Sequence, residues 1–114
     1  MIVRIGLDIV ETERIRRAMA NPRFASRILT ARERGRALSV AYVAGRWAAK
    51  EAIAKAIGTD LSWQDVDIDN DPTGHPYALF REGVLAPNQQ VQISITHERN
   101  LAAAVAILQE LPSN

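Results

Sequence analysis

The pattern of hydrophobic and polar positions changes character about halfway along this chain of 114 residues. After a short alternating segment, apolar residues of the first half recur every three or four positions, as on one face of a helix. The second half alternates with a period of two, which is typical of half-buried strands. This order predicts an α+β fold, with one long central helix packed on a mainly antiparallel sheet. The length suits one domain over residues 1–114.

Four elements are expected in the first half, and residues suited to capping lie at their ends. They are a strand over Ile2–Leu7, short helices over Glu11–Ala20 and Arg23–Ile28, and a long helix over Val40–Ile57. Asn21 and Pro22 suit the N-cap and first position of the second short helix, and Gly58 suits the end of the long one. Thr30 and Glu33 have capping-box spacing, which predicts a further helical segment.

Strands dominate the expected structure of the second half. They are Val66–Asp69, Pro76–Phe80 and Val91–Thr96, the first two joined by a turn over Asp71–Gly74. Leu101–Leu108 is ambiguous, because its alanines favour a helix whereas its continuous apolar run also fits a buried strand. A chain reversal at residues 98–100 favours a hairpin, and therefore the strand.

One position on the long helix carries a charge among apolar neighbours. On a wheel of about 100° per residue, the stripe that holds Glu51 also contains Val40, Ala44, Trp47 and Ala54. A buried carboxylate is unfavourable unless a cation or a metal ion compensates it. The alternative is a solvated ion pair with Lys55, worth about 0.2–0.5 kcal/mol. A second apolar stripe, Tyr42, Ala49 and Ile53, predicts a central helix or one that another subunit also buries.

Composition and charge narrow the class of protein. Hydrophobic residues make up 47% of the chain, enough for a core, and cysteine is absent, which excludes disulfides and thiolate metal sites and fits a reducing cytoplasm. The apolar run over Leu101–Leu108 is too short to span a bilayer. The net charge is +1, yet arginines gather between residues 14 and 36 with few acids among them. Such a basic surface favours an anionic partner: a phosphate, a nucleic acid or an acidic protein.

Two acids and their cationic neighbours are candidates for a metal-dependent phosphate site. Asp8, at the expected end of the first strand, and Glu51 could together hold a hard divalent ion such as Mg²⁺, which takes further ligands from water and substrate phosphates. The cations Arg46, Lys50 and Lys55 suit the phosphates themselves. Structural roles stay open as alternatives, namely a turn or N-cap for Asp8 and a solvated helix flank for Arg46 and Lys50.

Several segments, taken in order, resemble one family. GLDIVETERI at residues 6–15, GRWAAKEAIAK at 45–55 and SITH at 94–97 resemble the holo-acyl-carrier-protein synthases, the small single-domain branch of the phosphopantetheinyl transferases. FASRILTARE at residues 24–33 resembles a fourth stretch of that family, and Gly58-Thr59 the start of a fifth. The N-terminal aspartate and the Lys-Glu-x-x-x-Lys helix are specific as a pair, although either is weak alone.

The resemblance implies Mg²⁺-dependent transfer of the 4′-phosphopantetheine arm of coenzyme A to a serine of apo-acyl carrier protein, leaving adenosine 3′,5′-bisphosphate. Asp8 and Glu51 match the family's metal ligands, and Glu51, or a metal-bound water that it orients, would help to deprotonate the serine. Lys55 matches the lysine that stabilises or protonates the leaving phosphate. The positions that match coenzyme A contacts are Arg46, Lys50, Gly58, Thr59 and His97. For His97 a core-edge histidine is the alternative.

The resemblance also implies a partner and an assembly. Acyl carrier proteins are acidic, so the basic helices are expected to bind one through Arg14, Arg17, Arg23 and Arg27. Members of this branch form trimers with sites between subunits, which agrees with a long helix that is apolar on two sides. A cytoplasmic enzyme without a membrane partner is therefore expected.

Two features depart from the family pattern, and a second function stays open. Relatives continue after the long helix with Gly-Thr-Gly, whereas this chain has Gly58-Thr59-Asp60 in a shortened turn, so altered nucleotide contacts are expected. His75 stands where relatives commonly have lysine, which weakens a cation there. The alternative function is a non-catalytic module that binds RNA or an acidic protein through its arginines. Sparse aromatic residues argue against single-stranded nucleic acid as that partner.

Overall fold

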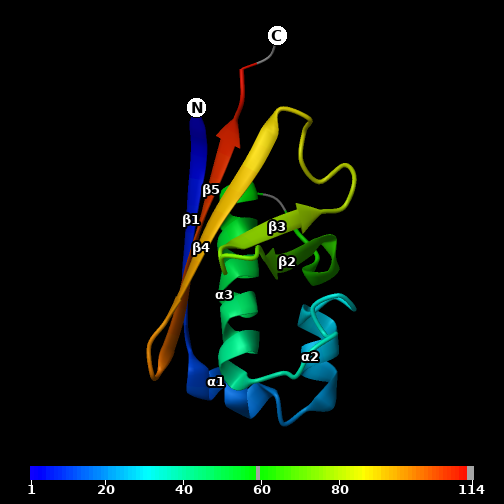
Figure 1. Ribbon diagram of the computed structural model, residues 1–114, viewed down its shortest axis with the longest axis vertical. Coiled ribbons are helices and arrows are strands. Elements are labelled where there is room, and N and C mark those ends of the chain that lie inside the picture. The colour runs from blue at the N-terminus through cyan, green and yellow to red at the C-terminus, as the bar shows by residue number, and fades with distance from the viewer. Residues whose placement is uncertain (59, 113–114) are drawn as a thin grey trace.

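The computed structural model describes residues 1–58 and 60–112 and has the expected α+β architecture (Figure 1). Its helices are α1 (Thr12–Ala18), α2 (Pro22–Ile28) and α3 (Val40–Ile57), followed by a short 3₁₀ helix, η1 (Trp63–Asp65). Its strands are β1 (Ile2–Glu11), β2 (Val66–Asn70), β3 (Pro76–Phe80), β4 (Gln89–His97) and β5 (Leu101–Glu110).

Two antiparallel sheets form the β part of the molecule. The larger has the strand order β1-β5-β4, and β2 pairs with β3 in a separate sheet. The ambiguous segment Leu101–Leu108 belongs to β5 and forms a hairpin with β4, as expected. In Figure 1 the three long strands lie on one side of α3 and α2 lies on the other, while β3 passes across the front of the helix.

Strand β1 is longer than the sequence predicts. Asp8 is expected at the end of the strand, but pairing with β5 continues as far as the Glu11–Leu101 pair, so Asp8 lies inside β1 opposite Ala104. The extended pairing also keeps Glu11 in the strand, and α1 begins at Thr12. The interior of a paired strand fixes the Asp8 backbone more firmly than a strand end would.

The two faces of β1 have opposite surroundings. Gly6 faces α3, and a Cβ on it would collide with the backbone carbonyl of Ala52, so glycine permits the close approach of strand and helix. On the other face the apolar side chains stay in solvent, with exposed fractions of 59%, 65% and 63% for Ile5, Leu7 and Ile9. The strand alternates as predicted, but its large apolar residues point away from α3.

Helix α3 begins and ends where the sequence predicts. The Ser39 hydroxyl accepts a hydrogen bond from the Tyr42 amide at 3.0 Å, and Gly58 ends the helix with a φ of 77°, in the left-handed region that favours glycine. Within the described residues, no helix combines the length and the apolar character that crossing a bilayer would require.

The second apolar stripe of α3 is buried inside this chain. Ala49 and Ile53 are fully buried in a core that also contains Val66 and Ile68 of β2. Of the two alternatives, a central helix accounts for Ala49 and Ile53, because β2 belongs to the core around them. The exposed apolar surface lies on the outer face of β1 instead.

The segment between α2 and α3 forms the predicted capping box without the predicted helix. The Thr30 amide donates to Glu33 Oε1 at 2.8 Å, and the Glu33 amide donates to Thr30 Oγ1 at 3.3 Å. Turns rather than a helix follow. The Glu33 carboxylate also accepts bonds from the Ile68 amide at 2.8 Å and from Lys50 Nζ at 2.6 Å, so it joins distant elements.

Candidate active site

An ion pair joins β1 to the C-terminal half of α3. The Lys55 ammonium lies 3.2 Å from Asp8 Oδ1 and donates a hydrogen bond to the Leu7 carbonyl at 2.9 Å. The Asp8 side chain is 14% exposed and that of Lys55 is 54% exposed. Asp8 is therefore a largely buried carboxylate whose compensating charge reaches it from the solvent side, where another cation could also approach.

Glu51 lies one helical turn before Lys55, on the same flank of α3. The solvated Glu51–Lys55 pair is not formed, because Lys55 bonds to β1 instead. Within the described part of the chain, the Glu51 carboxylate has no hydrogen bond or ion pair. It is half-buried and lines a pocket of about 150 Å³ together with Lys50, Ala54, Leu61, Ser62 and Trp63.

The donor chemistry of Asp8 and Glu51 fits Mg²⁺. Both supply carboxylate oxygens, and Lys55 brings Asp8 to the flank of α3 that carries Glu51. In residues 1–58 and 60–112, no group of three or more His, Cys, Asp or Glu side chains is arranged to hold a metal. A site here offers two carboxylates, which agrees with the preference of Mg²⁺ for completing its shell with water and phosphate oxygens.

Lys50 is buried, contrary to the expectation of a solvated helix flank. Its side chain is 2% exposed, and its ammonium bonds to Glu33 Oε1 at 2.6 Å and to the Ile28 and Trp63 carbonyls at 2.8 Å each. These acceptors use all three ammonium donors. Burial lowers the pKa of Lys50, and the bond with Glu33 opposes that shift. The arrangement favours a role in the fold over a contact with coenzyme A.

Arg46 is also buried, on the flank of α3 that faces β2. Its Nη2 donates to Asn70 Oδ1 at 2.7 Å and to the Ile68 carbonyl at 3.3 Å, and its guanidinium carbon lies 4.4 Å from the Tyr42 ring centroid. The alternative of a solvated flank is therefore wrong for Arg46. Its Nε is buried and has no hydrogen-bond partner in residues 1–58 and 60–112, so Arg46, unlike Lys50, retains a donor that these residues do not satisfy.

His97 lies at the other edge of the large sheet from Asp8. Its Nε2 lies 3.0 Å from the Ala41 carbonyl, and its exposed ring rests against Gly45. Arg46 and His97 therefore surround the N-terminal half of α3, whereas Asp8 contacts the C-terminal half. Within one chain, two of the predicted coenzyme A contacts, Arg46 and His97, therefore lie away from Asp8, whereas Lys50 lies beside Glu51 and Gly58 ends the same half of α3.

The turn after α3 is held by a residue that sequence reasoning missed. Arg4 Nη1 donates to the Ile57 carbonyl at 3.2 Å, and a side chain at Gly58 would collide with that guanidinium. Arg4 shares a strand face with Asp8, but no sequence pattern indicates that it reaches a helix end far along the chain. The prediction for Thr59 lies outside the described residues, and Asp60 is exposed.

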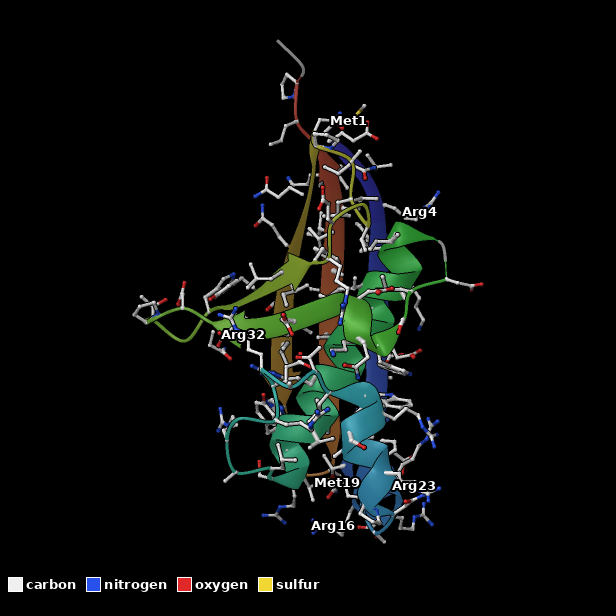
Figure 2. The ribbon with its side chains drawn as sticks, turned by 90° about the vertical axis from the view of Figure 1, so that its right-hand side faces the viewer. Met1, Arg4, Arg16, Met19, Arg23 and Arg32 are labelled. Atoms are coloured by element: carbon white, nitrogen blue, oxygen red, sulfur yellow. The ribbon has the colours of Figure 1, made fainter. Side chains whose placement is uncertain are left out.

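The predicted carrier-binding arginines are all exposed. Arg14 and Arg17 lie on α1, and Arg23 and Arg27 lie on α2. Figure 2 shows that Arg16 of α1 and Arg23 of α2 come to the same end of the molecule. The two short helices therefore form one basic surface.

A stack of aromatic rings connects this basic surface to the candidate site. Trp47 of α3 stacks on Phe24 of α2 at 5.7 Å between ring centroids and on Trp63 of η1 at 4.7 Å. The Arg14 guanidinium carbon lies 5.5 Å from the Trp47 ring. Trp63 also lines the pocket beside Glu51. Sequence reasoning missed the stack, because its three rings come from segments with no common periodicity.

Comparison with known proteins gives a consistent set of matches. The model of the 4′-phosphopantetheinyl transferase superfamily matches residues 4–106. The chain is 43% identical over 126 residues to the holo-[acyl-carrier-protein] synthase of Anoxybacillus flavithermus, covering 99% of this chain and 100% of the relative. It is similar to the crystal structure of the Bacillus anthracis synthase in complex with CoA (3′,5′-ADP), with a TM-score of 0.83, 38% identity and coverage of 98% and 99%. For the synthase of Neisseria meningitidis the TM-score is 0.86, with 31% identity and coverage of 96% and 100%.

The match to the A. flavithermus synthase spans more positions than the 114 residues of this chain, so that relative has residues that this chain lacks. The shortened turn after α3 agrees with this difference. The matches nevertheless cover almost the whole chain and favour an enzyme over a non-catalytic basic module. The chain belongs to the 4′-phosphopantetheinyl transferase superfamily, and it is an enzyme of the holo-[acyl-carrier-protein] synthase type.

Proposed function

We propose that this enzyme transfers 4′-phosphopantetheine from coenzyme A to a serine of an acidic apo-acyl carrier protein, with Mg²⁺, and releases adenosine 3′,5′-bisphosphate. The observation that carries the proposal is the contact between Asp8 and Lys55 on the flank of α3 that holds Glu51, in a chain of this family. The Bacillus anthracis relative was crystallised with CoA (3′,5′-ADP), which supports coenzyme A as the donor.

In the proposed mechanism Asp8 and Glu51 hold the metal ion. When bound, Mg²⁺ offsets the negative charge that develops on the pyrophosphate as its bridge breaks. Glu51 accepts the proton of the carrier serine, whose oxygen bonds to the phosphorus next to the pantetheine arm. The bond from that phosphorus to the bridging oxygen breaks, and Lys55, which is exposed enough to turn from Asp8, stabilises the leaving phosphate.

We further propose a cytoplasmic homotrimer with its sites between subunits. The metal ligands contact the C-terminal half of α3 from β1, whereas Arg46 and His97 surround its N-terminal half, so one coenzyme A would need both sets from different chains. The exposed apolar face of β1 is available for the contact between subunits. Light scattering on the purified protein gives the assembly state directly, and a monomer at micromolar concentration would contradict it.

Mixing inactive variants tests the shared site. Glu51→Gln and Arg46→Gln are each expected to lose transfer, but they affect different chains of one site. Refolding them together should restore part of the activity, because some interfaces then pair an intact Glu51 with an intact Arg46. No recovery, with mixed trimers shown by native mass spectrometry, would place both residues in the same chain's site.

The reaction itself is tested by measuring the mass of the carrier protein by mass spectrometry. The enzyme is incubated with coenzyme A, Mg²⁺ and an apo-carrier protein, and the carrier is expected to gain one phosphopantetheine mass. Carrier with its serine replaced by alanine is the control for the acceptor, and a chelator is the control for the ion. No mass gain across several carriers from different pathways would refute the proposal.

A further inference from the structure

The buried Glu33–Lys50 pair is the most completely bonded polar cluster of the described chain, and the reaction as proposed does not use it. The exposed fractions of the two side chains are 0% and 2%, and their nitrogen–oxygen distance is 2.6 Å. Glu33 also accepts from the Thr30 and Ile68 amides. A buried pair of this kind stabilises little over an apolar replacement, but removing one partner strands a charge. Its presence therefore needs a reason other than stability.

The pair contacts α2 at the end of that short helix. Lys50 Nζ donates to the Ile28 carbonyl at 2.8 Å, in the last turn of α2, where a cation is favourable. Neighbouring carbonyls are also bonded, since Gln64 Nε2 donates to Arg27 at 3.0 Å and Arg34 Nη1 donates to Leu29. The C-terminus of α2 is thus fixed by side chains from α3, η1 and the connecting loop.

The same ammonium contacts the wall of the pocket beside Glu51. It donates to the Trp63 carbonyl at 2.8 Å, and the Trp63 ring stacks on Trp47, which in turn stacks on Phe24 of α2. Lys50 precedes Glu51 on α3. One buried group therefore ties the helix that carries Arg23 and Arg27 to the position next to the proposed metal ligand.

We propose that Lys50, held by Glu33, is a positioning residue that sets the place of α2 relative to Glu51, and so aligns a docked carrier protein with the reacting phosphate. The inference rests on the proposed function and replaces the coenzyme A contact expected for Lys50. Its consequence is that loss of Lys50 weakens productive docking of the carrier while binding of coenzyme A is kept.

The test compares Lys50→Met with the double variant Lys50→Met/Glu33→Gln. The single variant strands the Glu33 charge and loses stability, whereas the double variant removes that charge and recovers part of the stability. The recovery is partial because glutamine has one acceptor oxygen, whereas the Thr30 and Ile68 amides donate to separate oxygens of Glu33. Neither variant restores the bonds from Lys50 to the Ile28 and Trp63 carbonyls. KM for the apo-carrier should rise about tenfold in both, since a small displacement of a docked group has large effects, and KM for coenzyme A should stay unchanged.

A spectroscopic signature and a matched control separate positioning from folding. The stacked Trp47 and Trp63 rings should give an exciton couplet in circular dichroism, and it should weaken in both variants. Asp69→Asn breaks the exposed Arg32–Asp69 pair, which ties the same loop to β2, and should change neither the couplet nor either KM. Recovery of the carrier KM together with stability in the double variant would overturn the proposal. A rise in KM for coenzyme A instead would also overturn it.

Carrier binding measured by calorimetry keeps this test separate from that of the reaction. If the wild type binds an acidic apo-carrier but transfers nothing, the proposed function fails, whereas weaker binding by the double variant still supports the positioning role. If the double variant binds the carrier as well as the wild type does, the positioning role fails even when transfer is observed.

Discussion

Helix α3 carries two lysines five residues apart, and their surroundings are opposite. Lys50 is buried and gives all three donors to protein acceptors, whereas Lys55 is half-exposed and reaches a single carboxylate and a carbonyl on β1. The acids differ in the same way, because Glu33 is saturated with bonds and Glu51 has none among the described residues. Charged groups whose hydrogen-bonding capacity is satisfied by the protein stabilise the fold, whereas charged groups with unused capacity are available to a ligand.

The largest expected effect on activity is at Glu51. Glu51→Gln should lower the rate of carrier modification by about a thousandfold, because it removes the proposed metal ligand and the proposed proton acceptor. Stability should be unchanged, since the Glu51 carboxylate has no hydrogen bond or ion pair among the described residues. Mass spectrometry of the carrier measures the rate of its modification, and thermal unfolding measures the stability of the enzyme. A variant that retains near wild-type rate would remove Glu51 from the site.

The two lysines allow the same substitution to be compared in both surroundings. Lys50→Met should lower the free energy of unfolding by about 3–5 kcal/mol, because it leaves Glu33 buried without its cation. Lys55→Met should cost less stability than Lys50→Met, because solvent can still reach Asp8 from the side that the half-exposed Lys55 occupies, and it should lower kcat instead. Urea unfolding and steady-state kinetics measure both. Equal losses of stability would show that the two flanks do not differ as described.

Stability measured at a series of pH values tests the description of Lys50 as a buried cation. Burial lowers the pKa of Lys50 below its ordinary value of 10.5. Between the two pKa values the unfolded chain binds more protons than the folded chain, so stability rises with pH up to about 10.5. The stability of the wild type relative to Lys50→Met/Glu33→Gln should increase over this range in urea unfolding. A decrease would mean that the folded state raises the pKa of Lys50.

The smallest effect is expected at an exposed pair. Hydrogen bonds from the Asn70 amide and from Arg32 lower the pKa of Asp69. The stabilisation from this shift is present above about pH 3.8, the ordinary value, and is lost as pH falls through the lowered pKa. Because both side chains of the pair are exposed, that stabilisation is small, and Asp69→Asn should leave the midpoint of thermal unfolding almost unchanged at pH 7. A large fall in this midpoint would mean that exposed ion pairs also stabilise the fold.

Local signals predicted most of the fold. The period of α3, its Ser39 and Gly58 ends, the Asn21–Pro22 start of α2 and the β4–β5 hairpin all depend on neighbouring residues, and the structure has them. The capping-box spacing of Thr30 and Glu33 predicted a helix that the structure does not have. Glu33 instead bonds to Lys50 and Ile68, which are distant in sequence.

For the candidate site, the sequence identifies residues but not their contacts, for the same reason. A helical wheel identifies Glu51 as unusual, and the family resemblance pairs it with Asp8. Neither shows that Lys55 bonds to β1 or that Lys50 is buried, because both facts depend on which segments meet in space. The flank of a helix on which a charge lies can be read from sequence, but its partner across the core cannot.

Side chains of β1 alternate between its two faces, and this alternation has a further consequence. Even positions, such as Gly6 and Asp8, face α3, and odd positions carry the exposed apolar side chains. A shift of one residue in pairing with β5 would exchange the two faces. It would bury Leu7 against α3 and turn Asp8 to the outside at the same moment. A single insertion in β1 would therefore displace the proposed metal ligand and the apolar surface proposed for the contact between subunits together, so a variant of β1 that still assembles should also keep Asp8 facing α3.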